Sequence, residues 1–146
     1  MEDFNYCIWF LPEKNHEWYS YTNAFNPHMT IKSRLEKESL QDYNKIINSQ
    51  KKMIVRLKGK LYQTEINHFY ALQYDIEPIN KEDIPVWWPE DAHISFKYKY
   101  HLPYTTKEIQ EIGNSIQIRE ALMDSIEVYK CTGDFSTWPK ITISDL

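Results

Sequence analysis

Apolar and polar residues alternate along several stretches of this 146-residue chain. Alternation with a period of two is typical of β-strands that are buried on one side. The pattern predicts strands over residues 6–12, 53–63, 69–78 and 125–135. Two further strands are predicted to begin near His28 and His93, each after a loop rich in aromatic and polar residues.

A helical period replaces the alternation in two places. Over residues 39–49, apolar side chains recur every three or four positions, which predicts an amphipathic helix. A second helix is predicted to begin at Thr105 or Thr106, because Glu108 follows as in a capping box. Both helices are expected to cover one face of a sheet.

The order of these elements repeats in the two halves of the chain. Each half contains a strand, a loop, a strand that begins with His, a helix and a further strand. We therefore expect an α+β fold built from a duplicated β–β–α–β unit with an added hairpin. We expect one domain over residues 1–146, with lobe-like halves at roughly 1–66 and 67–146.

Composition and charge narrow the function classes. The net charge of −4 and pI of about 5.7 argue against a protein that coats long nucleic acids. The three glycines form no glycine-rich phosphate loop, which excludes folds that bind nucleoside triphosphates or dinucleotide cofactors.

We find no signal peptide and no apolar stretch of membrane-spanning length, so we expect a cytoplasmic protein. Cys7 and Cys131 are expected to be reduced, buried thiols.

Two short motifs carry the candidate chemistry. Each presents an imidazole, a hydroxyl and an ammonium group at alternate positions: His28, Thr30 and Lys32 in the first, and His93, Ser95 and Lys97 in the second. In a regular strand these side chains share one face. Two imidazoles can act as acid and base on a phosphodiester, while the hydroxyls donate to its oxygens. The pair of motifs therefore predicts an enzyme.

Other interpretations of these residues stay open at this point. A single histidine is more often structural, and His28, His93 and Asp91 can also be read as metal ligands, although the metal-binding spacings are missing. Lys32 and Lys97 either attract a polyanionic substrate or are solvated lysines at strand ends.

The remaining histidines have no partner motif. His16 and His68 are expected to be ordinary loop or turn residues. His101 lies eight residues beyond His93, too far along a strand for both to contact one phosphate.

With its two His-x-Thr/Ser motifs, the chain resembles the 2H phosphoesterases. That resemblance implies a bilobal fold in which antiparallel sheets line a central cleft and helices lie outside. It also implies a phosphodiesterase that needs no metal or other cofactor, with His28, Thr30, His93 and Ser95 as catalytic residues. The family includes RNA ligase-like cyclic phosphodiesterases, 2′,5′-oligoadenylate phosphodiesterases and small phage nucleases that destroy the cyclic oligonucleotides of CBASS immunity. In length the chain is most similar to these compact viral members.

The loops before the two motifs are expected to bind the substrate. They contain Tyr19, Trp87 and Trp88, whose rings can stack on nucleobases. The alternative is that Trp87 and Trp88 fill the space between the two lobes.

The resemblance and the charge together lead to one principal expectation. It is a hydrolase that cleaves the 3′–5′ bonds of cyclic oligonucleotide messengers, counteracts CBASS-type signalling and, for a viral protein, acts in the host cytoplasm. One alternative is an enzyme for RNA ends with 2′,3′-cyclic phosphate or for 2′,5′-oligoadenylate. Another is a non-catalytic protein that sequesters nucleotides. The expected partner is a small cyclic or linear oligonucleotide, with no long nucleic acid, membrane or obligatory protein partner.

Overall fold

A computed structural model describes residues 6–23, 25–48, 52–66, 69–130 and 140–141. Within these ranges there are seven strands: β1 (Tyr6–Pro12), β2 (Met29–Leu35), β3 (Met53–Ile66), β4 (Phe69–Pro78), β5 (His93–Tyr100), β6 (Glu120–Lys130) and β7 (Lys140–Ile141). The α-helices are α1 (Asn44–Ile47) and α2 (Thr106–Ser115). Three short 3₁₀ helices accompany them: η1 (Glu17–Tyr21), η2 (Glu38–Tyr43) and η3 (Lys81–Asp83).

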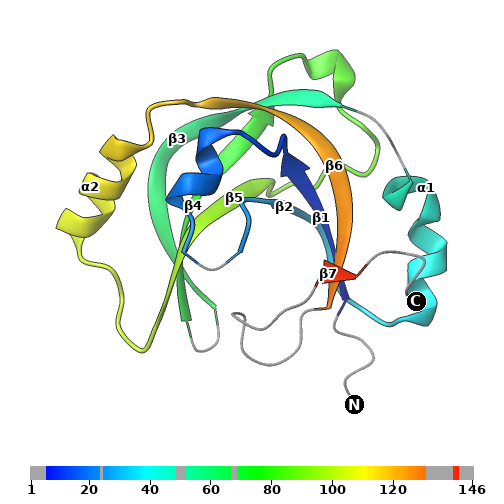
Figure 1. Ribbon diagram of the computed structural model, residues 1–146, viewed down its shortest axis with the longest axis horizontal. Helices are drawn as coiled ribbons and strands as arrows, with labels where there is room; N and C mark the ends of the chain where they lie inside the picture. The colour runs from blue at the N-terminus through cyan, green and yellow to red at the C-terminus, as the bar shows by residue number, and fades with distance from the viewer. Residues whose placement is uncertain (1–5, 24, 49–51, 67–68, 131–139, 142–146) are drawn as a thin grey trace.

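The described strands form one antiparallel sheet, which confirms the expected α+β class. Its order is β1-β2-β5-β4-β3-β6-β7, and β6 also pairs with β1. Six of the strands therefore form a closed circuit of pairings, in which β2 lies next to β5 and β3 lies next to β6. Figure 1 shows the strongly curved sheet, with α1 beside β6 and α2 beside β3 on its outer sides.

The two faces of the sheet carry separate cores. On the outer face, strand residues such as Ile8 and Leu72 pack with Leu40, Ile47 and Ile109 of the helical segments. The inner face carries a smaller cluster that is dominated by rings: Cys7, Trp9, Leu11, Phe25, Ala71, Tyr98 and Tyr129. Cys7 is buried and free, as expected, whereas Cys131 lies outside the described residues.

One of the two predicted helices is confirmed, and the other is replaced by shorter helical segments. The capping box of α2 is confirmed, since Thr105 accepts from the Glu108 amide and Glu108 accepts from the Thr105 amide. The predicted helix over 39–49 is instead a 3₁₀ segment followed by a single α-helical turn. Ser, Asp and Asn side chains in this stretch compete with helical backbone hydrogen bonds, which accounts for the weak helix.

The last long strand begins earlier than the alternation suggested. β6 starts at Glu120 rather than at residue 125, because Ala121 and Met123 are buried opposite Val55 and Met53 of β3. These pairings add to the contacts between the two halves of the chain, which β1 with β6, β2 with β5 and β3 with β4 also join.

A bulge interrupts the long strand β3. The pairing with β4 shifts between Lys58 and Tyr62, and Gly59 adopts a φ of 74° there. This left-handed conformation suits glycine because a Cβ atom would be strained. The bulge sets which face the β3 side chains after it occupy.

The bulge leads to a test of stability. We expect Gly59→Ala to lower the free energy of unfolding by about 1 kcal/mol, or the melting temperature by about 3 °C, from backbone strain alone, since no atom lies within 4 Å of the added Cβ. Gly113→Ala is the matched control: in α2 its Cβ meets Leu61 at an ordinary 3.5 Å, so helix propensity should stabilise that variant. Chemical denaturation of the three proteins measures both effects, and an unchanged Gly59→Ala protein would contradict the assignment of strain.

Candidate active site

The pairing of β2 with β5 brings the two motifs together. Met29 is matched with Ile94 across this antiparallel pair. Residues on either side of a matched pair are matched in turn, so Thr30 lies opposite His93 and His28 lies opposite Ser95. The four side chains therefore occupy one face, which is the inner face because the ring of His28 packs on Trp9.

The two imidazoles are diagonal neighbours in this arrangement. Such neighbours on adjacent strands lie about 7–8 Å apart, a separation that accommodates one phosphate between the ring nitrogens. They also interact electrostatically, since the charge of His93 contributes to lowering the pKa of His28. The structure thus brings together all four residues that were predicted to be catalytic.

Both histidines are oriented by their own backbone. His28 Nδ1 lies 2.8 Å from the Asn26 carbonyl oxygen, and His93 Nδ1 lies 2.8 Å from the Asp91 carbonyl oxygen. A carbonyl can only accept, so each Nδ1 carries the proton and donates it. Each neutral ring then has an unprotonated Nε2.

The environment of His28 is apolar. Its ring stacks on Trp9 at a centroid distance of 3.5 Å, meets the edge of Phe25 and is only 7% exposed. Burial is the main cause that lowers the pKa of His28 from 6.5 to about 3; the Asn26 carbonyl opposes this shift and His93 adds to it. His28 is therefore neutral at physiological pH.

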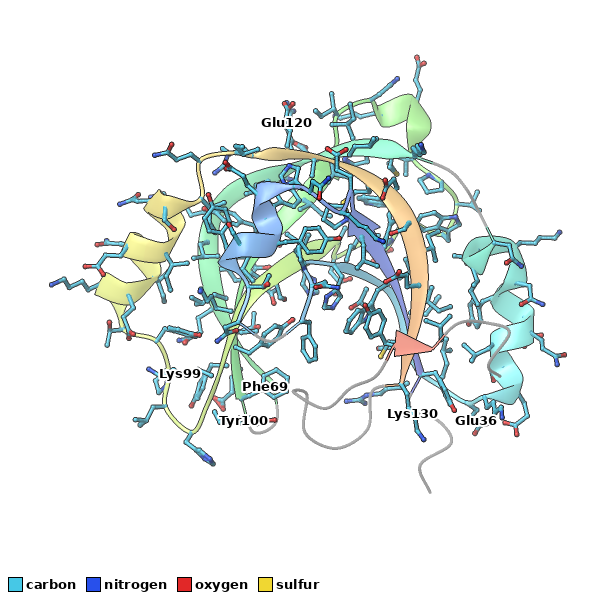
Figure 2. The ribbon with its side chains drawn as sticks, viewed as in Figure 1. Glu36, Phe69, Lys99, Tyr100, Glu120 and Lys130 are labelled. Atoms are coloured by element: carbon cyan, nitrogen blue, oxygen red, sulfur yellow. The ribbon has the colours of Figure 1, made fainter. Side chains whose placement is uncertain are left out.

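The environment of His93 is polar. Asp75 of β4 is its matched residue across the strand pair, and Gln73 is matched with Ser95. The hydroxyl of Tyr62 on β3 lies within hydrogen-bond distance of both Asp75 and Gln73. Rings on the same face continue toward Phe69 at the start of β4 and Tyr100 at the end of β5, both labelled in Figure 2.

The prediction that Lys32 and Lys97 share the catalytic face is wrong. The β1–β2 pairing shifts so that Lys32 is matched with Ile8, and the β4–β5 pairing shifts so that Lys97 is matched with Leu72. Ile8 and Leu72 belong to the outer core. A bulge directly after each His-x-hydroxyl motif thus reverses the alternation, which a regular strand pattern does not reveal.

Trp87 and Trp88, which were predicted to stack on nucleobases, pack on the outer side of the sheet and not beside the motifs. Trp87 and Trp88 pack against the outer core, with Trp87 on the edge of Phe10. They therefore contribute to the packing of the outer core. The hydroxyl of Tyr19 donates to the Pro12 carbonyl oxygen at 2.7 Å, so it serves the fold of the chain. Burial, followed by the nearby acidic side chains, raises the pKa of Tyr19 to about 12.

The other two described histidines, His16 and His101, lie outside the motif strands β2 and β5. His16 caps η1, accepting from the Trp18 amide at Nδ1, and its Nε2 contacts the Glu120 carbonyl oxygen. His101 is exposed beyond the end of β5, and His68 lies outside the described residues.

No group of three or more His, Cys, Asp or Glu residues in the described part of the chain can hold a metal ion. Within the same part, no helix is long and apolar enough to cross a membrane.

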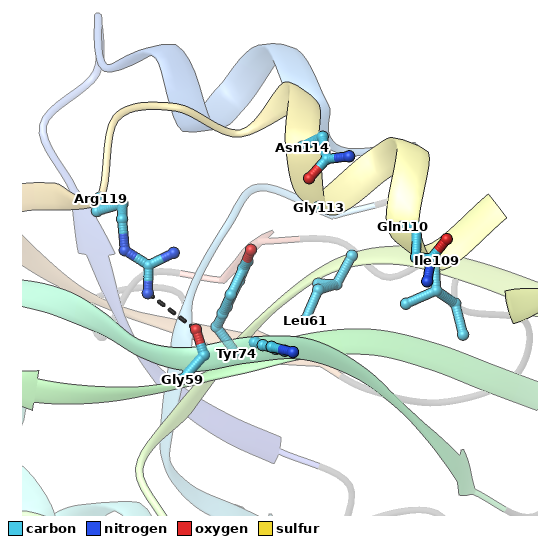
Figure 3. A pocket seen from close by; sticks show the side chains of 9 residues that line it. Gly59, Leu61, Tyr74, Ile109, Gln110, Gly113, Asn114 and Arg119 are labelled. Carbon is cyan, nitrogen blue, oxygen red and sulfur yellow. Dashed lines mark hydrogen bonds between the residues drawn. The ribbon is translucent and has the colours of Figure 1, made fainter. Parts of the chain in front are cut away.

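A cavity of about 450 Å³ lies away from the histidines, between α2 and the outer face of β3. Figure 3 shows Arg119 donating to the Gly59 carbonyl oxygen beside it, and Arg119 also donates to Leu57. The guanidinium lies over the Tyr74 ring, 5.3 Å from its centroid. Since its donors are directed to the backbone, Arg119 holds the bulge of β3 in place.

The sequence reasoning missed the neighbours that make the two histidines unequal. Trp9 was read only as a strand residue, although its alternate position in β1 places it on the face opposite to Ile8 and Phe10. Gln73 and Asp75 were a readable signal: they are alternate polar residues within an otherwise apolar strand. The contact with Tyr62 depends on the β3 bulge and had no such signal.

A scan against protein-family models finds no match for this chain, and a search of curated proteins finds none either. The site is therefore described by its geometry alone.

The burial of His28 predicts a pH dependence of stability. The unfolded chain takes up a proton on this residue near pH 6.5, whereas the folded protein does so only near pH 3. Stability that is present at pH 7 is therefore lost as the pH falls toward 3, by about 2 kcal/mol between pH 7 and pH 5. Urea denaturation should show this loss in the wild type and in His101→Gln, but a smaller loss in His28→Gln. Equal pH slopes in all three proteins would show that His28 titrates normally.

Proposed function

We propose that this protein is a phosphodiesterase of the 2H type, in which two imidazoles act on one phosphate without a metal. The observation that carries this proposal is the match of Met29 with Ile94, which places His28, Thr30, His93 and Ser95 side by side on one face of the sheet. Acid, base and two hydroxyl donors around one point form a constellation suited to displacement at phosphorus.

The strand order supports a duplicated fold of this type. Exchanging β1 with β4, β2 with β5 and β3 with β6 leaves the closed circuit unchanged. The local details also repeat: each His donates to the carbonyl two residues earlier, and each motif ends in a bulge. These correspondences favour two β–β–α–β units over an accidental likeness.

The unequal surroundings of the histidines assign their roles. His28 is buried among rings and stays neutral, so its free Nε2 is the general base. His93, on the polar side next to Asp75, is then the general acid. When an anionic phosphate lies beside His28, its charge favours the imidazolium, which raises the basicity of His28 in the complex.

The reaction follows from these roles. His28 Nε2 takes the proton of the attacking oxygen as that oxygen bonds to phosphorus. His93 starts this step as the imidazolium, with a proton on Nε2 in addition to the one that Nδ1 donates to the Asp91 carbonyl oxygen. As the bond from phosphorus to the leaving oxygen breaks, that oxygen takes the proton from His93 Nε2. Thr30 and Ser95 donate to the non-bridging oxygens, where negative charge accumulates. The attacking oxygen comes from water or from a 2′-hydroxyl of the substrate, and exchange with water then restores both rings.

The substrate that we propose is a cyclic oligonucleotide messenger with 3′–5′ bonds, and the biological role is to counteract CBASS-type antiviral signalling. The net charge of −4 supports a small ligand over a long nucleic acid, which needs an extended basic surface. The placement of Lys32 and Lys97 away from the inner face supports the same choice.

An assay with His93→Ala tests the reaction. We expect its kcat to fall by about 10²- to 10⁴-fold, because the leaving oxygen loses its proton donor. The control is His101→Ala, which removes an exposed histidine beyond the same strand and should keep full activity. Cyclic di- and trinucleotides, linear 2′–5′ oligomers and RNA with a 2′,3′-cyclic phosphate form the substrate panel, with a chelator present.

The panel separates the alternatives. Turnover of the cyclic oligonucleotides supports the proposal, and turnover of only the linear or cyclic-phosphate substrates assigns the same chemistry to RNA ends. Binding without turnover of any substrate indicates a sequestering protein. Activity that the chelator abolishes and zinc or manganese restores would overturn the metal-free mechanism.

A further inference from the structure

A directed chain of hydrogen bonds crosses the inner face beside the second motif. The Thr64 hydroxyl donates to Gln73 Oε1 at 3.1 Å, which fixes the orientation of the Gln73 amide. Gln73 Nε2 then donates to the Tyr62 hydroxyl at 2.9 Å, and Tyr62 donates to Asp75 Oδ1 at 2.5 Å. Each donor has one acceptor, so the chain has a single direction and ends on a carboxylate.

The β3 bulge allows this chain to form. Tyr62 is matched with Gln73, yet its hydroxyl reaches the carboxylate two residues further along β4. Burial and the bond to Asp75 raise the pKa of Tyr62, so its hydroxyl stays protonated as the donor. The Gln73 side chain is only 5% exposed, so the middle of this series of hydrogen bonds is held rigidly.

The last member of the chain is placed to contact a ligand. Asp75 is exposed, and in the described part of the chain its carboxylate bonds only to Tyr62 through Oδ1. Because it is the matched residue of His93, its side chain projects from the same face of the sheet as the hydroxyl and imidazole groups of the motifs, and Oδ2 keeps its capacity to accept. An ionised carboxylate can only accept, so it repels a phosphate and selects a group with N–H or O–H.

We propose that Asp75 accepts a hydrogen bond from a ribose hydroxyl of the substrate, on the side of the phosphate where His93 acts. This inference rests on the proposed function. The ribose is directly attached to the scissile phosphate, whereas a base is one glycosidic bond further away, and Asp75 is next to His93. The Thr64–Gln73–Tyr62 chain holds the carboxylate in place, so the site selects ribonucleotides over 2′-deoxyribonucleotides.

Binding measurements separate this contact from catalysis. The probes are cyclic di- and trinucleotides with phosphorothioate linkages, which resist cleavage, each as the ribose and the 2′-deoxyribose form. We expect the wild type to prefer the ribose form by about 10- to 100-fold, the usual effect of a hydrogen bond to a charged group. In Asp75→Ala this preference should fall to nearly one, because the affinity for the ribose form alone decreases.

Two further variants define the source of the preference. Tyr62→Phe keeps the Asp75 carboxylate but removes the hydroxyl that holds it in place, which we call its clamp. This variant should therefore reduce the preference for the ribose form less than Asp75→Ala does. Glu77→Ala is the matched control, since Glu77 is two residues further on the same strand and pairs with Arg56 instead. It removes an equal charge and should leave the preference unchanged.

The outcomes are distinct. A preference lost only when Asp75 or its clamp is changed supports the inference. An equal loss of affinity for both sugars in Asp75→Ala, or a preference that survives it, would overturn the inference while the proposed function stands. If the wild type neither binds these probes nor cleaves any substrate of the panel, the proposed function fails and the inference fails with it.

Discussion

The register between β2 and β5 is the constraint on which the site depends. Side chains alternate along a strand, so a slip by one residue would send one motif to the opposite face. Met29 and Ile94, the matched pair, are both fully buried in the outer core. Their packing on the outer face fixes the register, and this register aligns the two imidazoles and the two hydroxyls on the inner face. The apolar residue between the His and the hydroxyl is thus as necessary to the site as the polar ones.

The same architecture makes two similar motifs chemically different. The ring of His28 packs against Trp9 and Phe25 in the ring cluster of the inner face, whereas Asp75 and Gln73 lie beside the second motif. In the proposed mechanism this difference assigns the roles: desolvation keeps His28 neutral as the base, and the hydrogen-bonding groups beside His93 suit it to act as the acid.

The sequence predicted most strands and the cap of α2, because each of these depends on local chemistry. The two motifs also supplied the four residues that the β2–β5 pairing places on one face. The predicted positions of Lys32 and Lys97 failed because a bulge changes the alternation without any marker residue at that point. Trp87 was misplaced for another reason: an aromatic residue in a loop can pack on either face, and only the tertiary structure decides. The clamp on Asp75 depends on pairing between β3 and β4, which no single segment encodes.

The bond from each imidazole to a carbonyl two residues upstream has a wider consequence. No acidic side chain from elsewhere in the fold is required to select the tautomer, because the main chain of the motif does so itself. Each motif therefore sets the orientation and tautomer of its own imidazole, and the pairing of β2 with β5 only has to bring the two imidazoles close together. A geometry of this kind places few demands on the side chains around the motif, because the orienting bonds come from the Asn26 and Asp91 carbonyl oxygens.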